Sequence, residues 1–482
     1  MTKKQIAIER FDNFLDNTKI KTELCYNFLP SYKLGQSYSV RSALFPPSYG
    51  SAESLELNTT DANLQNIKGV TFFKQFGPAM QKSVYRILLY GEDEKIYINE
   101  LFNGHNFLFW LYSLTFDSAP ISLSYKKDDS DVVILASKEK MVVWKAEKSP
   151  YTVPDVPVIT SMCMNDGVLF CSIQAPAYKV WYATDLDAEN IGNIGANSGY
   201  ISFEDELGDA KKIIALDEEV YVFREFGISK IKYLQNSITT SQIYATNSRI
   251  LENTVCACGN FIIFMTFDGL YIFNGVKVTK MDIDIKNMLD GLNKNAVSSS
   301  LGNKYYLALR LNYNDNKTSE LDNYNYINNT ILVINTDDFS FHFMRGYDVQ
   351  SFQPAKTTEF EKLLFTSNTL YSNKLCEIVP TSENYTGQIN KYWRSGELTK
   401  NNNQKLFTTL TVNASKNVNF TFLYDDDKIA TFTTYKDGVN KFNFRLYCKT
   451  VKLEITTDKK SAEVNKVSMD YYDCCFRTNN KI

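Results

Sequence analysis

The chain has 482 residues, 44% of them hydrophobic and 14% aromatic, with a formal net charge of −3 at pH 7. This length is too great for one core, so we expect two or three domains unless a repeat architecture joins the chain into one large unit. The mild acidity argues against free-standing nucleic-acid binding. The polar residues 1–10 argue against a secretory signal. No apolar run approaches the ~18 residues of a membrane-spanning helix.

The 9 cysteines and 2 histidines predict neither a disulfide framework nor a metal centre. An odd number of cysteines in a long chain without a signal indicates reduced, mostly buried thiols made in a cytoplasm. Cys256-Ala257-Cys258 and Cys474-Cys475 lack the spacing of a zinc site. His105 follows a turn, and His342 alternates with aromatic residues on an expected strand. We therefore expect no metal and no cofactor.

Residues 1–68 lack sustained periodicity, and we expect an extended N-terminal arm with one short helix over residues 6–15. The Pro46-Pro47 pair within this arm cannot belong to a central strand. Long segments of this kind usually wrap a neighbour or a partner. A strap across the chain's own domain is the equal alternative.

One pattern recurs through residues 69–390, at intervals of roughly 35–55 residues, which lies within the range of propeller and solenoid repeats. It consists of an apolar run, a short polar turn and a second run rich in aromatic residues. Because a hairpin alone cannot bury both faces, such units stack as blades, and a ring of blades leaves few exposed edges. We expect a β-propeller of about seven blades, with two β-sandwiches as the alternative. The copies lie at residues 85–99, 132–144, 160–171, 213–223, 261–273, 301–309 and 362–372.

The copies between Tyr178 and Met281 are the ones around which the repeat is organised. Asp268-Gly269 separates two apolar runs, which predicts a hairpin because Gly supplies the positive φ of a tight turn. The run around Val220 and Val222 is apolar on both faces, so this strand should lie between two other layers. Residues 314–329, rich in Asn, Asp and Tyr, should form a surface loop that interrupts one blade.

The pattern changes near residue 390, and residues 391–482 predict a small C-terminal β-sandwich whose strands alternate apolar and polar residues. Asp425-Asp426-Asp427 lies between two of these strands and should be a turn rather than a calcium site. The expected strands are residues 407–412, 418–424, 429–434, 441–446 and 451–455. The complete fold prediction is thus all-β, with an arm, a propeller and a sandwich in chain order.

No catalytic motif occurs in the sequence: it has no Gly-x-Ser-x-Gly, no phosphate loop, no dinucleotide fingerprint and no His-Glu-x-x-His. Carboxylates such as Asp185, Asp187 and Glu189 could serve a glycosidase, but that test is their separation in space. Carboxylates at strand ends are usually turn residues. We predict that the chain is not an enzyme, and we assign no catalytic, cofactor-binding or metal residue.

Several phrases of the chain resemble bacteriophage tail proteins of the packaged-DNA-stabilisation and tail-nozzle type. The segment Val180-Trp181-Tyr182-Ala183-Thr184-Asp185, with residues 187–190, resembles a turn of that family, and residues 219–231 and 268–275 look like the two blades that follow it. The stretch from Tyr392-Trp393 to Tyr472 is similar to the β-sandwich that often closes such chains. The likeness covers roughly residues 160–285 and 390–475 and fits the β-propeller expected from the repeats.

The resemblance implies a structural virion protein, made in the host cytoplasm and located in the tail. Such nozzle or hub subunits form a homo-oligomeric ring, with a hexamer favoured by the family, around the DNA exit channel. Portal, adaptor and other tail proteins are the implied partners, and genomic DNA passes through without sequence-specific binding; no membrane is involved. A mildly acidic chain suits a channel, because a wall that bound phosphates tightly would retain the DNA.

The alternative is a propeller at the tail tip that binds the host surface or a glycan. It requires exposed aromatic residues on one propeller face, for which Trp110, Trp144 and Trp181 are the candidates, although their apolar neighbours favour the blade core. The elements that we expect to make contacts are the N-terminal arm, the 314–329 insert and the C-terminal sandwich.

Overall fold

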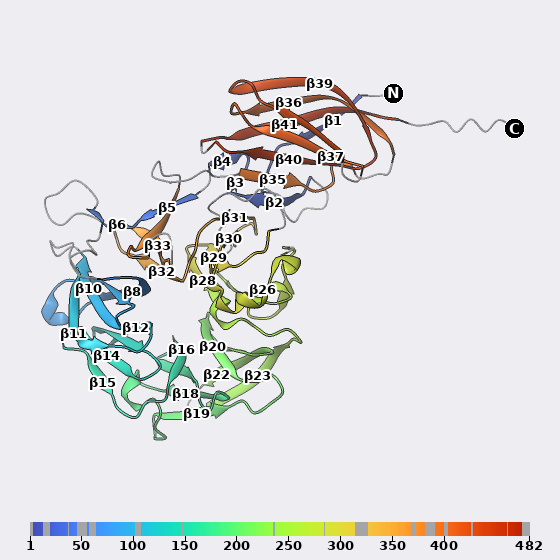
Figure 1. The fold of residues 1–482 in the computed structure, drawn as a ribbon. Coiled ribbons are helices and arrows are strands. Elements are labelled where there is room, and N and C mark those ends of the chain that lie inside the picture. The colour runs from blue at the N-terminus through green and yellow to red at the C-terminus, as the bar shows by residue number, and fades with distance from the viewer. Residues whose placement is uncertain are drawn as a thin grey trace.

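The computed structural model describes most of the chain (Figure 1). No α-helix is assigned in this part of the chain, and none of its helical segments is long or apolar enough to cross a bilayer. The short 3-10 turns are η1 (Pro78–Met80), η2 (Ala188–Asn190), η3 (Glu252–Thr254), η4 (Lys286–Met288) and η5 (Gly291–Asn295). The described residues are 3–12, 20–36, 38–45, 55–56, 64–101, 108–146, 148–234, 237–283, 285–313, 326–367, 372–380, 391–399, 403–425, 428–459 and 461–474.

Six separate four-stranded sheets, together with the first four strands of a nine-stranded sheet, make the seven blades of a β-propeller. The first three blades are β8–β11 (Ile67–Gln75, Val84–Gly91, Lys95–Leu101, Phe109–Thr115), β12–β15 (Ile121–Lys127, Ser130–Ala136, Met141–Lys145, Tyr151–Val153) and β16–β19 (Ile159–Asn165, Val168–Ile173, Lys179–Ala183, Ser198–Ser202). The next three are β20–β23 (Ala210–Leu216, Glu219–Arg224, Gly227–Leu234, Ser237–Ala245), β24–β27 (Cys256–Cys258, Phe261–Thr266, Gly269–Phe273, Val278–Lys280) and β28–β31 (Val297–Leu301, Lys304–Leu309, Thr330–Asn335, Phe341–Arg345).

The seventh blade combines β32–β34 (Ser351–Lys356, Glu361–Thr366, Cys376–Pro380) with β5 (Tyr38–Ser42) from the N-terminal arm. Its innermost strand, β32, contacts β8 of the first blade, so the ring closes. Chain segments more than 330 residues apart are therefore joined in one sheet, for example where Ser42 pairs with Cys376. The expectation of about seven blades is confirmed.

The blades pack through apolar side chains on both faces of their middle strands. On β21, Val222 belongs to a buried cluster that contains Phe170 of the third blade, whereas Phe223 belongs to one that contains Phe264 of the fifth. The strand is thus buried between two layers, as its sequence predicts. The hairpin at Asp268-Gly269 is also present, with Gly269 at a φ of +133° and paired with Thr266.

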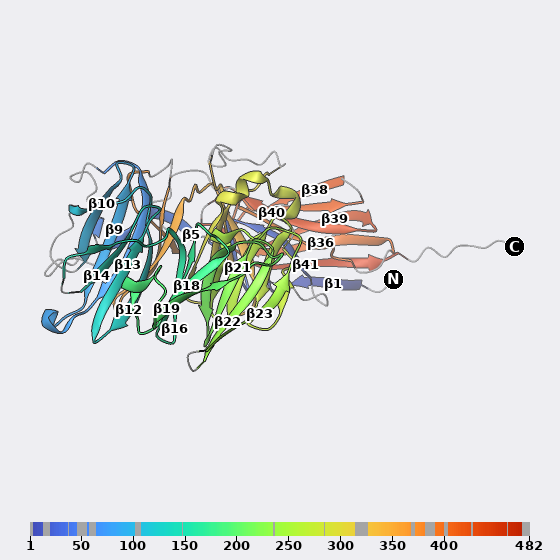
Figure 2. The same ribbon diagram turned by 90° about the horizontal axis from the view of Figure 1, so that it is seen from below.

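The C-terminal strands form a sandwich, as expected. They are β35 (Lys391–Ser395), β36 (Lys405–Ala414), β37 (Asn419–Tyr424), β38 (Lys428–Thr433), β39 (Gly438–Cys448), β40 (Val451–Thr457) and β41 (Val464–Asp473). One sheet contains β36, β39 and β41, and the other contains β35, β40, β37 and β38. The sandwich projects from the rim of the ring in Figure 1 and lies beside the propeller when seen from below in Figure 2.

Strands of the N-terminal arm complete both sandwich sheets. β1 (Lys3–Ile8), β3 (Phe28–Pro30) and β4 (Leu34–Gln36) join the sheet of β41, and β2 (Thr22–Tyr26) pairs with β35. β2 also lies parallel to β31, so one nine-stranded sheet runs from the sixth blade into the sandwich. Within the described residues the arm therefore straps its own chain; β6 (Leu44–Phe45) and β7 (Leu55–Glu56) make a separate small ladder.

The expected helix over residues 6–15 is wrong where the structure describes it, because Lys3–Ile8 is a strand. Its backbone pairs antiparallel with β41, from Lys3 opposite Tyr472 to Ile8 opposite Val467. A sheet edge supplies these hydrogen bonds from a distant part of the chain, and tertiary pairing of this kind overrides a weak local helix signal.

Candidate functional site: an axial cavity and a side pocket

The carboxylates considered for a glycosidase have structural partners. Glu189 accepts a hydrogen bond from Tyr151 and pairs with Lys145 Nζ at 3.0 Å. These two contacts, with Tyr151 first, lower the pKa of Glu189, whereas a general acid needs a raised one. Asp187 accepts a hydrogen bond from the Asn190 side chain, and Asp185 occupies a turn at a φ of +56°. These residues therefore stabilise the loop after β18.

His342 is buried on β31, where burial, and then the charge of Lys304, lower its pKa to about 3. The imidazole is consequently neutral at physiological pH. His105 lies outside the described residues.

The eight described cysteines are free thiols, and all but the half-buried Cys256 are buried. Burial raises the pKa of Cys163 to about 12, which makes this thiol a poor nucleophile and a poor metal ligand. No group of three or more potential metal ligands occurs among the described residues. Asp425 accepts hydrogen bonds from the backbone N–H groups of Lys449 and Thr450, so it stabilises a turn; Asp426 and Asp427 lie outside the described residues.

The three tryptophans proposed for ligand binding lie in three different blades. Trp144 is buried against Phe73, with ring centroids 5.8 Å apart. Trp181 is half-buried and packs edge-on against Tyr200. Trp110 is 36% exposed on an outer strand. They do not form a common aromatic surface.

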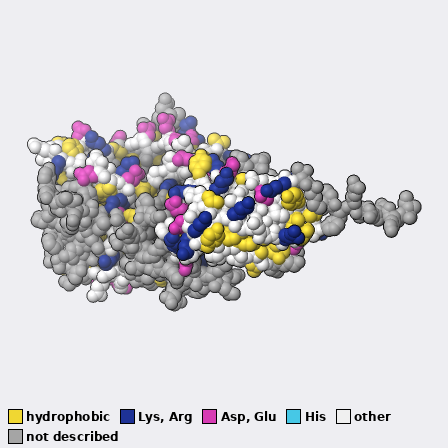
Figure 3. Space-filling view, turned by 90° about the horizontal axis from the view of Figure 1, so that it is seen from above, with side chains coloured by type: hydrophobic (Ala, Val, Ile, Leu, Met, Phe, Trp, Pro, Cys, Tyr) yellow, Lys and Arg dark blue, Asp and Glu magenta, His cyan; other side chains and the backbone are white. Residues whose placement is uncertain are grey.

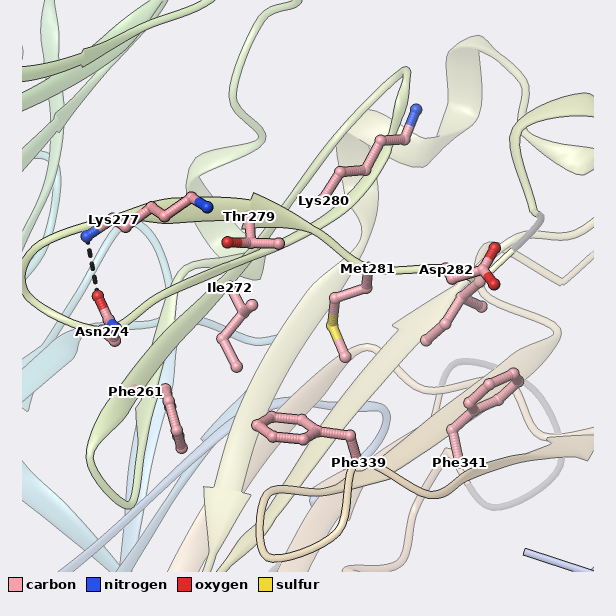
Figure 4. A pocket seen from close by; sticks show the side chains of 11 residues that line it. Phe261, Ile272, Asn274, Lys277, Thr279, Lys280, Met281, Asp282, Phe339 and Phe341 are labelled. Carbon is pink, nitrogen blue, oxygen red and sulfur yellow. Dashed lines mark hydrogen bonds between the residues drawn. The ribbon is translucent and has the colours of Figure 1, made fainter. Parts of the chain in front are cut away.

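A pocket of about 340 Å³ opens between the fifth and sixth blades (Figure 4). In this view the side chains of Phe261, Ile272, Met281 and Phe339 point toward a common space. Phe339 lies at the tip of the hairpin between β30 and β31, with a φ of +55°, which is unusual for a bulky residue. Its ring packs edge-on against that of Phe261, with the ring centroids 5.4 Å apart. The pocket has the chemistry to hold an apolar side chain.

The exposed surface of the sandwich mixes basic and apolar side chains (Figure 3). The 11-residue strand β39 is the last strand of its sheet and pairs only with β36 among the described strands. Val439 and Tyr447 are 57% and 53% exposed near its two ends, and the exposed Lys441 and Arg445 lie between them. A long edge strand offers backbone hydrogen bonds to another chain, and basic residues on it restrict which chain can pair.

The innermost strands of neighbouring blades contact one another around the propeller axis. In each blade the strand nearest the axis stands at one end of the blade, so the backbone groups along its outer side face the axis. These strands are β8, β12, β16, β20, β24, β28 and β32. Gly69 of β8 packs closely here, since a Cβ on it would lie 2.7 Å from that of Ala119. A cavity of about 360 Å³ lies on this axis, lined by residues of these innermost strands.

Lys212 brings a positive charge to this cavity. It lies on β20, and its side chain lines the cavity. Its neighbour Lys211 instead pairs with Asp209 Oδ2 at 2.8 Å and with Glu225 Oε1 at 3.5 Å. Sequence reasoning missed Lys212, because a Lys-Lys pair before an apolar run looks like a solvated strand end.

The insert, expected at residues 314–329, is described only from Tyr326, after which Asn328 and Asn329 are buried.

No protein-family model matches the chain, and no curated protein matches it. Among solved structures, it is similar to one of BBS1N in complex with ARL6DN, soaked with lead (11% identity, 66% of this chain, 94% of that chain, TM-score 0.41). It is also similar to Kluyveromyces lactis Hsv2 (9% identity, 54% and 81% coverage, TM-score 0.34) and to a chain of the mitotic checkpoint complex (10% identity, 62% and 88% coverage, TM-score 0.38). At these identities and scores the likeness carries no inference about activity or partners.

Proposed function

We propose that this chain is a structural subunit of a bacteriophage tail. In this role further copies assemble with it into a ring around the DNA exit channel, as a nozzle or hub that retains packaged DNA and passes it on during infection. The proposal starts from the resemblance to tail-nozzle proteins of the phrases at residues 180–190, 219–231 and 268–275. These phrases fall on the third, fourth and fifth blades, and the similar C-terminal stretch falls on sandwich strands β35–β41.

The observation that carries the proposal is the nine-stranded sheet that joins the sixth blade to the sandwich through β2. Backbone pairing across this junction fixes two large bodies relative to each other, which a subunit under mechanical and internal DNA pressure requires. Free hinges between domains are the usual arrangement when the interface is small.

The path of the DNA in this proposal runs between copies rather than through the propeller. A cavity of about 360 Å³ has the size of a small-molecule site, so a duplex does not fit the propeller's own axis. We assign the sandwich surface with its edge strand β39 to contacts with neighbouring tail subunits. Portal and adaptor proteins are the other neighbours that the resemblance implies.

The test is cryo-electron microscopy of phage particles that contain this chain. We expect a symmetric ring on the tail axis, in contact with the portal or an adaptor, with the sandwich between adjacent copies. Density at fibre bases or at the distal tip would contradict the proposal and favour the host-surface-binding alternative. Absence of the chain from purified particles, measured by mass spectrometry, would contradict both.

A further inference from the structure

Lys212 is a cation on the propeller axis to which the proposed tail function gives no role. Its side chain is half-buried and lines the cavity of about 360 Å³. Among the described residues, no carboxylate lies within the 4.0 Å ion-pair distance of its ammonium group, although Lys211 next to it has two such partners. A charge that is partly withdrawn from water and has no counter-ion is costly, so this position favours a negatively charged neighbour.

The groups around Lys212 do not supply that neighbour. Burial lowers the pKa of Lys212, and the thiols of Cys256 and Cys163 and the carboxylate of Glu252 oppose this effect. Burial also raises the pKa of both thiols, that of Cys163 to about 12, so these thiols are uncharged near neutral pH. Glu252, beyond ion-pair distance, is left as the acidic group that acts on Lys212.

The remaining lining can donate hydrogen bonds to an anion. Thr71 and Ser122 line the same cavity, and they come from the innermost strands of two blades. Each of these strands has one edge that pairs with no other described strand, and that edge adds backbone N–H groups. The volume lies at the lower end of the ~300–1,000 Å³ typical of small-molecule sites.

We infer that Lys212 and the surrounding hydroxyl and N–H groups bind one small anion of the phosphate or carboxylate class on the propeller axis. A hydrogen bond from an ammonium group to an anionic oxygen is shorter and stronger than one between neutral groups, which gives Lys212 the largest share of the affinity. The inference does not depend on the proposed tail function, and the two can fail separately.

The test uses the full chain, titrated with sodium phosphate by calorimetry and followed by thermal denaturation, with sodium chloride at equal ionic strength as the reference. We expect one phosphate per chain and a midpoint that rises with phosphate concentration. In Lys212→Met, binding should weaken about tenfold or more, because the charged hydrogen bond is lost. Met has a similar length and no charge to desolvate, so this variant should fold.

The matched control is Lys277→Met, which removes an exposed lysine from the fifth blade. Phosphate also stabilises proteins by exclusion from their surface, but that effect is common to all three proteins. Titration with succinate in place of phosphate tests whether an anion of the carboxylate class binds. An unchanged response in Lys212→Met, an equal loss in Lys277→Met, or the lack of saturable binding by either anion would overturn the inference.

Discussion

At the residue scale, His342 makes stability depend on pH. It is 5% exposed in the sixth blade, and its pKa of about 3 lies well below the ordinary value of ~6.5. Between these two values the unfolded chain binds a proton that the folded chain does not bind. The free energy of unfolding contributed by this residue is therefore fully present above pH ~6.5 and is lost as the pH falls toward 3.

The prediction is that lowering the pH from 7 to 5 costs the wild-type protein about 2 kcal/mol more than it costs His342→Gln. Urea denaturation at each pH measures the difference. His105 is present in both proteins, so its titration cancels in the comparison. Parallel pH profiles for the two proteins would contradict the prediction, because they would show that His342 is protonated as readily in the folded protein as in the unfolded chain.

At the scale of elements, the sequence predicts the hairpins well and their partners poorly. Each of the seven repeated phrases falls on a different blade, because turn residues and apolar runs are local signals that the chain carries within about ten residues. The partners of β1, β2 and β5 lie hundreds of residues away and leave no mark in the local pattern. The sequence of the arm therefore predicts an irregular segment, and it predicts a helix over residues that partly belong to β1. Lys212 was missed for the same reason, since only the assembled ring places it on an axis.

Strand β5 closes the seventh blade, and this closure can be tested with two adjacent proline substitutions. β5 pairs only with β34 among the described strands, with Val40 opposite Ile378 and Arg41 opposite Glu377. Successive backbone N–H groups of an edge strand point alternately toward the sheet and away from it. Of Val40→Pro and Arg41→Pro, we expect one to lose about 1–3 kcal/mol of stability and the other to be tolerated.

The midpoint of chemical denaturation measures both proline variants, and each is the control for the other. If neither substitution lowers the stability, β5 is not hydrogen-bonded to β34. Two equally severe ones would point to a requirement for both edges of β5, as in a strand with neighbours on both sides.

At the scale of the molecule, the arm unites the propeller and the sandwich. Trp393 of β35 is fully buried, and its Nε1 donates a hydrogen bond to Thr22 Oγ1 of β2 at 3.1 Å. The Thr22 hydroxyl in turn donates to the Phe11 carbonyl oxygen at 2.7 Å, and the Phe11 ring packs edge-on against Trp393. One buried cluster includes Phe28 from the arm and Leu307 from the sixth blade along with sandwich residues. The C-terminal sandwich is consequently a unit made from both ends of the chain.

The last prediction follows from that shared core. Residues 391–482 alone lack β1–β4, which complete both sheets, and lack the arm side chains Ile8, Phe11, Phe28 and Leu34 of the common cluster. We expect this fragment to show no cooperative thermal transition by circular dichroism or calorimetry. Residues 1–36 joined by a flexible Gly/Ser linker to residues 391–482 should restore one, because β1–β4 and the apolar side chains of the arm return together. A cooperative transition in the shorter fragment would contradict the shared core, and the arm would then be an accessory strap on a sandwich that folds by itself.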